Sequence, residues 1–233
     1  MRNLLSRVLR TAQEWGYIEA NPALSVRLPE MKHKEASFLS VEQVRLLLAE
    51  LQEPERTMVL LAVLTGLRRG ELFALRWKHL DLEGRVLRVR EAVYEGHFGT
   101  PKTRSSVREI PLGGDALNAL RKLPNGNPED LVFPSRKGTA IDPNNLVKRV
   151  LRPACDRAGI PRVAWKAFRH THATLLSDAG ESIKLAQAQL GHSDLGTTLQ
   201  VYTHRIPESQ RRAVDNLERV LFPSVPKFEE VVQ

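Results

Sequence analysis

Cysteine is almost absent from the sequence, with Cys155 as the single example among 233 residues. One thiol excludes an internal disulfide and any metal site built from several cysteines. Because Cys155 lies in a stretch with helical spacing of apolar residues, we expect it in the core rather than as a nucleophile. The sequence also lacks an opening signal segment and any run of roughly 20 apolar residues, the length that a membrane-spanning helix needs. These absences predict a soluble, cytoplasmic protein.

Acidic residues are outnumbered by basic ones. The chain has 35 Lys and Arg against 27 Asp and Glu, which gives a formal net charge of +8 at pH 7. Such an excess favours encounter with a polyanion, so DNA, RNA and anionic lipid all fit as partners. The length and an apolar content of 42% predict one main domain with a good-sized core and room for a small extra element.

Patterns of apolar residues predict an α+β fold, mainly α-helical with a small antiparallel β-sheet. Ser40 followed by Gln43 resembles a capping box that opens a helix through Leu51. Between Asp81 and Leu112, apolar and charged residues alternate on both sides of a polar, glycine-containing connection, which predicts the sheet. The other predicted helices cover residues 3–15, about 54–65, about 143–158, 166–179, 182–190 and 208–221, and an extended linker is predicted over 16–37.

One arginine follows a glycine break between two helical patterns. In the stretch TGLRRGEL at residues 65–72, an apolar helix breaks at Gly66 and a new one begins, which places Arg68 at a helix N-terminus. Backbone N–H groups and the helix dipole favour phosphate at such an end, and a guanidinium can grip two phosphate oxygens. A surface arginine after a turn fits the pattern equally well. Glu71 fits either a brace for Arg68 or an ordinary acid in the first turn.

A second basic cluster lies in the stretch AWKAFRHTHAT at residues 164–174. Lys166 and Arg169 are three positions apart on the predicted helix, so they share a face and can address one anion together. His170 and His172 are about 200 degrees apart around the helix axis, and we therefore reject a zinc site at this pair. For each histidine a structural role is the favoured interpretation.

A tyrosine follows a glycine-histidine pair in the stretch LGHSDLGTTLQVYTH at residues 190–204. A helix is predicted to end at Gly191, and a short helical stretch leads on to Tyr202. The chain has only three tyrosines. Taken alone, Tyr202 fits a buried structural tyrosine as well as a functional one.

In their order and spacing these segments resemble the tyrosine recombinases, the family of phage integrases and chromosome-dimer resolvases. That family combines an arginine in a T-G-x-R-x-x-E context, a lysine in a β-turn, an H-x-x-R pair, a G-H pair and a tyrosine about ten residues later. The resemblance runs from about residue 38 to 222. It implies the tyrosine recombinase catalytic-domain fold and an active site that contains Arg68, Lys102, Lys166, Arg169, His192 and Tyr202, with Glu71 in support.

The resemblance also implies a mechanism. Tyr202 attacks phosphorus and forms a 3′-phosphotyrosyl link, while Lys102 protonates the departing 5′ oxygen. Arg68 and Arg169 hold the non-bridging oxygens, and His192 donates a further hydrogen bond to the phosphate. Because the covalent link stores the phosphodiester, the resemblance implies no metal, ATP or other cofactor.

The sequence departs from the family pattern at two points. Lys166 stands where the family usually has histidine. A lysine near its reference pKa of about 10.4 is protonated at pH 7, so we interpret Lys166 as a donor that chiefly stabilises phosphate charge. The family usually carries a helical domain before the catalytic one. We therefore expect residues 1–35 to be the last helix of a truncated core-binding domain plus a linker, residues 36–222 the catalytic integrase domain, and residues 223–233 a C-terminal tail.

Double-stranded DNA is the partner that the resemblance implies, with a nucleoid-associated location in the cytoplasm. In related recombinases the C-terminal segment docks on a neighbouring subunit, so residues 223–233 suggest a homo-oligomer, a tetramer, on DNA. Two alternatives are strand relaxation like that of a type IB topoisomerase and a non-enzymatic DNA-binding remnant of an integrase. Non-specific grip on DNA is expected from basic residues of the hairpin and the 143–158 helix, namely Arg88, Arg90, Lys148, Arg149 and Arg152.

Overall fold

The computed structural model describes residues 2–26, 37–101, 104–124 and 126–191. By its internal contacts the chain divides into two units, residues 1–35 and 36–233. The first unit holds helix α1 (Arg2–Glu14), as predicted, and a short 3-10 turn at Pro22–Leu24 inside the stretch predicted to be extended. Asn21 ties this turn to α1, because its side chain donates to the Ser6 carbonyl at 2.9 Å and accepts from the Ala23 N–H at 3.0 Å.

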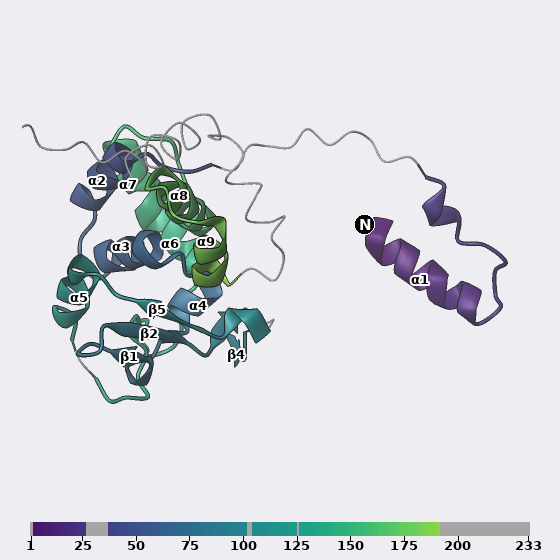
Figure 1. Ribbon diagram of the computed structural model, residues 1–233, viewed down its shortest axis with the longest axis horizontal. Coiled ribbons are helices and arrows are strands. Elements are labelled where there is room, and N and C mark those ends of the chain that lie inside the picture. The colour runs from purple at the N-terminus through teal and green to yellow at the C-terminus, as the bar shows by residue number, and fades with distance from the viewer. Residues whose placement is uncertain (1, 27–36, 102–103, 125, 192–233) are drawn as a thin grey trace, which may run out of the picture. The chain divides into compact units, whose positions relative to one another are not determined.

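The described part of the second unit is mainly helical (Figure 1). The predicted capping box opens α2, since Ser40 Oγ accepts from the Gln43 N–H and Gln43 Oε1 accepts from the Ser40 N–H. None of the described helices is long and apolar enough to cross a membrane. The helices of this unit are α2 (Val41–Ala49), α3 (Glu55–Thr65), α4 (Arg69–Phe73), α5 (Gly114–Arg121), α6 (Pro143–Leu146), α7 (Arg152–Arg157), α8 (Trp165–Asp178) and α9 (Ile183–Leu190), with shorter helical turns at Trp77–His79 and Arg104–Ser106.

The helix predicted over residues 143–158 contains a wider π-helical turn at Val147–Leu151, between α6 and α7. Pro153 in the first turn of α7 has no N–H to donate to the preceding turn. A π-helical turn is one of the ways in which a helix absorbs such a missing bond.

The predicted antiparallel sheet has the strand order β1 (Leu80–Asp81), β2 (Val86–Val89), β5 (Arg108–Pro111). Leu87 faces Ile110 across β2 and β5, and both side chains are buried. The polar connection between these strands is itself paired, because β3 (Ala92–Tyr94) and β4 (His97–Gly99) form a second, two-stranded sheet. Three-residue strands are too short for an alternation pattern to reveal.

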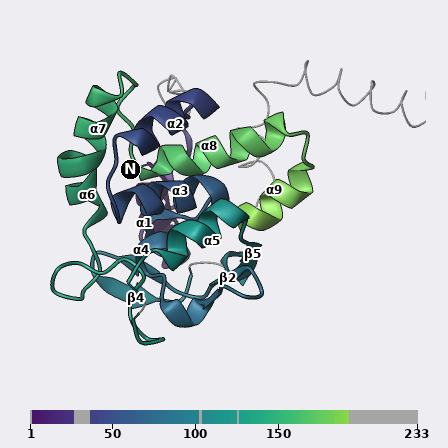
Figure 2. The ribbon, with the colours of Figure 1, turned by 90° about the vertical axis from the view of Figure 1, so that its left-hand side faces the viewer.

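Helix α3 is the centre of the core. It is apolar on almost every side, with Met58, Val59 and Leu61 at most 1% exposed. It packs against both α8 and α5 (Figure 2). Cys155 is completely buried, as predicted for a core residue. Burial of side chains of this size contributes about 1.5–3 kcal/mol each, so the helix that leads into Gly66 is firmly held.

Aromatic contacts fix the start of α8 against α4. The Trp165 ring meets Phe73 edge-on with 4.9 Å between centroids and meets Phe168 at 5.6 Å. Trp165 Nε1 also donates to the Pro143 carbonyl at 3.1 Å. These contacts set the direction of α8 and thus the position from which the Arg169 side chain extends.

Candidate active site

Arg68 lies in the turn between α3 and α4. Gly66 ends α3 in the left-handed conformation, with φ +63°, and a Cβ there would lie 2.5 Å from His172 Cδ2. Arg68 is then extended and immediately precedes α4, as predicted. Its backbone N–H donates to Glu71 Oε2 at 2.9 Å, and its Nη1 donates to Glu71 Oε1 at 2.8 Å. Glu71 therefore both closes the helix start and braces the Arg68 side chain.

Glu71 is shared with a second arginine that the sequence patterns did not single out. Arg108 of β5 donates from Nη2 to Glu71 Oε2 at 2.9 Å and from Nη1 to Glu71 Oε1 at 3.2 Å. Burial alone would raise the pKa of Glu71, but hydrogen bonds from Arg108 and Arg68, together with the charge of Arg108, outweigh it and hold the pKa below its ordinary value. A signal for Arg108 existed, because it shares the inward-facing phase of β5 with Ile110. A charge at such a position requires a buried partner.

Arg169 reaches the same place from the middle of α8. Its Nη1 donates to the Gly66 carbonyl at 2.7 Å, and its Nη2 donates to the Leu190 carbonyl. Burial lowers the pKa of Arg169 to about 9, with further lowering by the charges of Arg68 and Arg108 and an opposing effect of Glu71. The guanidinium thus stays charged at neutral pH, in a place where another negative charge would be favourable.

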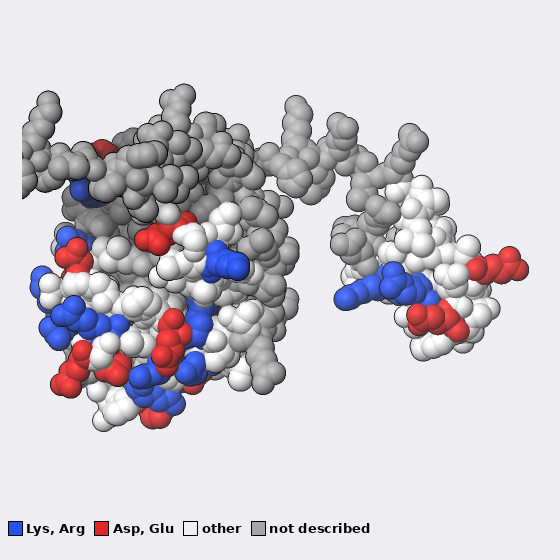
Figure 3. All heavy atoms as spheres, in the orientation of Figure 1, with Lys and Arg blue, Asp and Glu red and all other residues white. Residues whose placement is uncertain are grey.

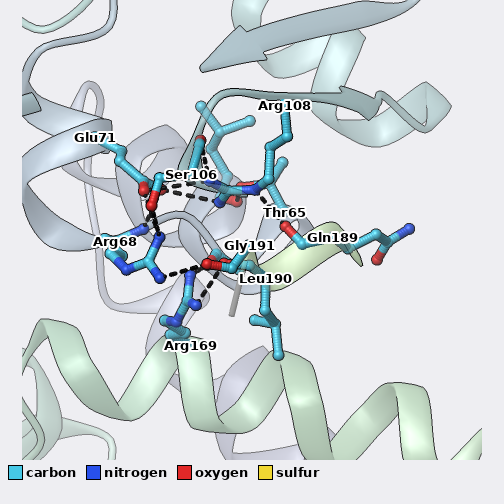
Figure 4. Close-up of polar contacts among 11 residues, drawn as sticks. Thr65, Arg68, Glu71, Ser106, Arg108, Arg169, Gln189, Leu190 and Gly191 are labelled. Atoms are coloured by element: carbon cyan, nitrogen blue, oxygen red, sulfur yellow. Dashed lines mark hydrogen bonds and ion pairs between the residues drawn. The ribbon is translucent and has the colours of Figure 1, made fainter. Parts of the chain in front are cut away.

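The side chains of these arginines all donate hydrogen bonds to the C-terminal end of α9. Three successive carbonyls each accept from a different arginine, as Figure 4 shows: Gln189 from Arg108, Leu190 from Arg169, and Gly191 from Arg68. The last carbonyls of a helix have no partner within it and carry partial negative charge, so cations are stabilised there. Gly191 ends α9 in the left-handed conformation, as the sequence predicted for a helix end.

The two histidines of α8 differ in surroundings. His172 is 5% exposed, with Nδ1 at 2.8 Å from the Val63 carbonyl and Nε2 at 3.2 Å from Gln189 Oε1. His170 is partly buried, and burial lowers the pKa of both rings. In the part of the chain that the structure describes, no group of three His, Cys, Asp or Glu residues could hold a metal ion. Lys166 lies exposed in the first turn of α8, one turn before Arg169.

Among the residues implied by the family resemblance, the structure brings Arg68, Arg169 and the supporting Glu71 together. Lys102, His192 and Tyr202 lie outside the described residues, as do the helix predicted over 208–221 and the C-terminal tail. Gly191, whose carbonyl accepts from Arg68, directly precedes His192, the next expected site residue in the sequence.

The basic residues expected to grip DNA fall into two groups. Arg88 pairs with Asp81 at 3.3 Å and with Glu109 at 3.1 Å, and Glu109 also lies 3.6 Å from Arg90. On the face drawn in Figure 3, basic and acidic side chains likewise interleave over the sheet-bearing end of this unit. The second group is exposed on the π-helical turn and the start of α7 and forms no ion pair with any described residue: Lys148, Arg149 and Arg152.

The sequence matches a family model described as the phage integrase family over residues 37–208. It is 30% identical to a protein named tyrosine recombinase XerC-like from Caldanaerobacter subterraneus subsp. tengcongensis, over 93% of this chain and 64% of that protein. The ICEBs1 integrase of Bacillus subtilis is 27% identical, again over 93% of this chain and 64% of the relative. The chain thus spans just under two thirds of the length of these relatives.

Solved structures show the same fold. The Tn1549 transposon integrase in complex with transposon right end DNA matches with a TM-score of 0.79 and 24% identity, over 93% of this chain and 77% of that one. The XerA recombinase matches with a TM-score of 0.60 and 22% identity, over 91% and 73% of the two chains. The mainly helical fold with small antiparallel sheets is therefore that of the tyrosine recombinase catalytic domains.

Proposed function

The chain belongs to the phage integrase family, and we propose on this basis that it is the catalytic part of a site-specific tyrosine recombinase, which cleaves and rejoins double-stranded DNA. The observation that carries the proposal is the convergence of the Arg68 and Arg169 guanidiniums on the end of α9, next to His192 in the sequence. Relatives named as recombinases and integrases support it, as do similar structures in complex with DNA.

The geometry of the arginine cluster suits a phosphodiester. Arg68 and Arg169 repel each other enough to contribute to the lowered pKa of Arg169. The Arg68 side chain keeps 37% of its surface exposed, so an anion can reach it. A bound phosphate relieves the repulsion, and the relief grows as negative charge builds up on the non-bridging oxygens in the transition state. The two guanidiniums would therefore favour the transition state over the ground state.

The other roles follow the family mechanism. Tyr202 attacks phosphorus and leaves a 3′-phosphotyrosyl link, and Lys102 protonates the 5′ oxygen as it departs. His192 donates a hydrogen bond to the phosphate, and Lys166, exposed one turn before Arg169, adds positive charge beside it. A 5′-hydroxyl from a partner strand reverses the step, because the energy of the phosphodiester is kept in the tyrosyl link. The reaction as proposed uses no metal or ATP.

Binding to the wider duplex would come from the exposed cations of the π-helical turn and α7. No described acid offsets the charge of Lys148, Arg149 and Arg152. By contrast, Arg88 and Arg90 would first have to break their ion pairs with Glu109 before they could bind DNA. We further propose a homo-oligomer, a tetramer on DNA, held through residues 223–233, and a nucleoid-associated location that follows from DNA binding.

A covalent-trapping assay tests the reaction. The chain is incubated with nicked duplexes from the flanks of its native gene, with EDTA present, and the products are separated on SDS gels. We expect an SDS-resistant protein–DNA adduct that Tyr202→Phe abolishes and Arg169→Met strongly reduces.

The same assay separates the alternatives. No adduct with this chain or with a longer version that has an upstream helical domain would contradict catalysis and favour a DNA-binding remnant. An adduct together with relaxation of a single supercoiled plasmid, but with no joining of two partner sites in the longer version, would favour the topoisomerase-like activity instead.

A further inference from the structure

We propose that Arg108 is a positioning residue, which shares the Glu71 carboxylate with Arg68 and so keeps the Arg68 guanidinium available to a phosphate oxygen. The proposal rests on the proposed function for the identity of that phosphate. It assigns a role to a buried arginine that makes no contact with substrate in the mechanism above.

The contacts of the Glu71 carboxylate show how it is shared. Oε1 accepts from Arg68 Nη1 at 2.8 Å and from Arg108 Nη1 at 3.2 Å. Oε2 accepts from the Arg68 backbone N–H at 2.9 Å and from Arg108 Nη2 at 2.9 Å. Each oxygen therefore binds one donor from each arginine, and the carboxylate lies between the two side chains (Figure 4).

The two arginines differ in exposure, and this difference gives them different roles: Arg108 neutralises Glu71, and Arg68 stays available to an anion. The Arg108 side chain is 7% exposed and that of Arg68 is 37% exposed, while the Glu71 side chain between them is 2% exposed. A buried carboxylate needs a buried counter-charge, and Arg108 supplies it. The positive charge of Arg68 is then not fully offset and can act on an anion. Without Arg108, the whole charge of Glu71 would act on Arg68, in surroundings where Coulomb interactions are strong.

Arg108 also links the segments around the cluster. Its Nε donates to the Gln189 carbonyl at the end of α9, and its Nη1 donates to the Ser106 carbonyl at 3.0 Å. Ser106 Oγ in turn accepts from Arg68 Nη1 at 3.1 Å. A lysine cannot replace this set of contacts, because its three donors radiate from one atom, whereas the guanidinium presents five in a planar fork.

The experiment compares four proteins: the wild-type chain, Arg108→Met, Glu71→Gln and the double variant. Two quantities are measured, the rate of adduct formation on the nicked duplex and the affinity for inorganic phosphate from NMR titration of the arginine side-chain N–H signals. We expect Arg108→Met to slow cleavage about 100-fold, the size of effect that small misplacements cause in active sites, and to weaken phosphate binding. Glu71→Gln in the same chain should recover a large part of both losses, because it removes the charge that Arg108 had offset.

A purely structural role predicts the opposite for the double variant, which would then be as slow as Arg108→Met or slower. That result would overturn the proposal, as would wild-type cleavage and phosphate affinity in Arg108→Met. Arg76→Met is the matched control. Arg76 also pairs with a carboxylate, Glu91 at 3.0 Å, and donates to a backbone carbonyl, that of Glu129, but has no contact with the cluster. Its loss should lower stability and leave phosphate affinity unchanged.

If Arg108→Met does not fold, Arg108→Lys is used in its place. We then expect the effects of Arg108→Lys and Glu71→Gln on the cleavage rate to be non-additive in the double variant. Additive effects on the cleavage rate would overturn the proposal. If the wild-type chain forms no adduct at all, the proposed function fails, but the phosphate titration still tests Arg108. Weaker binding in Arg108→Met with recovery in the double variant would support its role, and equal binding in all four proteins would overturn it.

Discussion

A left-handed glycine at the end of α9 sets the geometry of the site at the scale of single residues. Gly191 has φ +62°, and a Cβ there would lie 2.8 Å from the Ser105 carbonyl oxygen and 3.1 Å from Arg108 Nη1. We expect Gly191→Ala to lower the free energy of unfolding by about 1–3 kcal/mol, as measured by urea denaturation, because it adds a steric clash to the strained backbone. Gly159→Ala is the matched control, since Gly159 has φ +65° but nothing within 4 Å of a Cβ. An equal loss in both variants would contradict the close packing inferred at Gly191.

We expect His172 to make the stability of the chain depend on pH. Burial lowers the pKa of His172 below its ordinary value of 6.5, so the unfolded chain takes up a proton at a higher pH than the folded chain does. The stabilisation by neutral His172 is complete above pH 6.5 and is lost as the pH falls through the lowered pKa of the folded state. Between about pH 8 and about pH 5, wild-type stability should therefore fall more than that of His172→Asn, whose amide can still donate to the Val63 carbonyl. Parallel curves in denaturant unfolding would show that His172 does not cause the loss.

Single residues also show where the sequence was informative about the site. The glycine break before Arg68 and the spacing of Arg169 were sufficient to predict their segments, and the structure brings both guanidiniums to the end of α9. Arg108 was missed because its importance depends on a partner, Glu71, that is 37 residues away in the chain. Only the folded chain brings the two together.

At the scale of elements, the π-helical turn and α7 present cations that differ in their partners. Arg149 and Arg152 form no ion pair with a described residue, whereas Arg157 pairs with Glu50 at 2.8 Å. Arg162, just beyond α7, pairs with Asp156 at 2.7 Å. An unpaired cation that contacts DNA releases counterions on binding, and each such contact adds about −0.9 to the slope of log affinity against log salt.

We therefore expect the double variant Arg149→Gln/Arg152→Gln to make the slope for duplex DNA shallower by up to about 1.8, twice the value for one contact. The matched pair Arg157→Gln/Arg162→Gln removes the same number of guanidiniums and should change the slope much less. Fluorescence anisotropy over a range of salt concentrations measures both. Equal changes in the two pairs would mean that net charge alone, rather than this surface, determines binding.

Element types were predictable where apolar spacing is long and regular. The helices around Met58 and Phe168 have such spacing, and both exist close to the predicted bounds. Helix α5 was not among the predicted helices, because its eight residues give a weak pattern and it begins at Gly114, a poor helix former. The β3–β4 hairpin has only three residues per strand, and its pairing depends on a turn with Glu95 and Gly96 at positive φ rather than on a hydrophobic face.

For the whole molecule, the order of the motifs along the sequence predicted the fold better than any single predicted element did. The family resemblance runs over about residues 38–222, and the family model matches residues 37–208. The fold that the resemblance implied is the fold observed. Composition could not have shown this, because a net charge of +8 fits many polyanion-binding proteins. The motifs were informative because each residue type would meet a separate requirement of the proposed phosphoryl transfer.

We expect the arginine cluster to couple the stability of the whole chain to anions. Folding brings the guanidiniums of Arg68, Arg108 and Arg169 around a single carboxylate, Glu71, and their repulsion contributes to the lowered pKa of Arg169. A phosphate that binds only the folded chain, at ten times its dissociation constant, adds about 1.4 kcal/mol of stability. For a chain of this size that corresponds to a rise in Tm of about 3–6 °C.

Thermal unfolding in inorganic phosphate, with chloride at equal ionic strength as the reference, measures this rise. Phosphate also strengthens apolar burial by exclusion from protein surfaces, and that effect acts on any folded chain. Arg169→Met separates the two effects, because it removes one guanidinium of the cluster and leaves the general effect intact. We expect the phosphate-dependent rise in Tm to be clearly smaller in Arg169→Met than in the wild-type chain. If the rise is the same in both, the stabilisation comes from solute exclusion and the cluster does not bind phosphate in the absence of DNA.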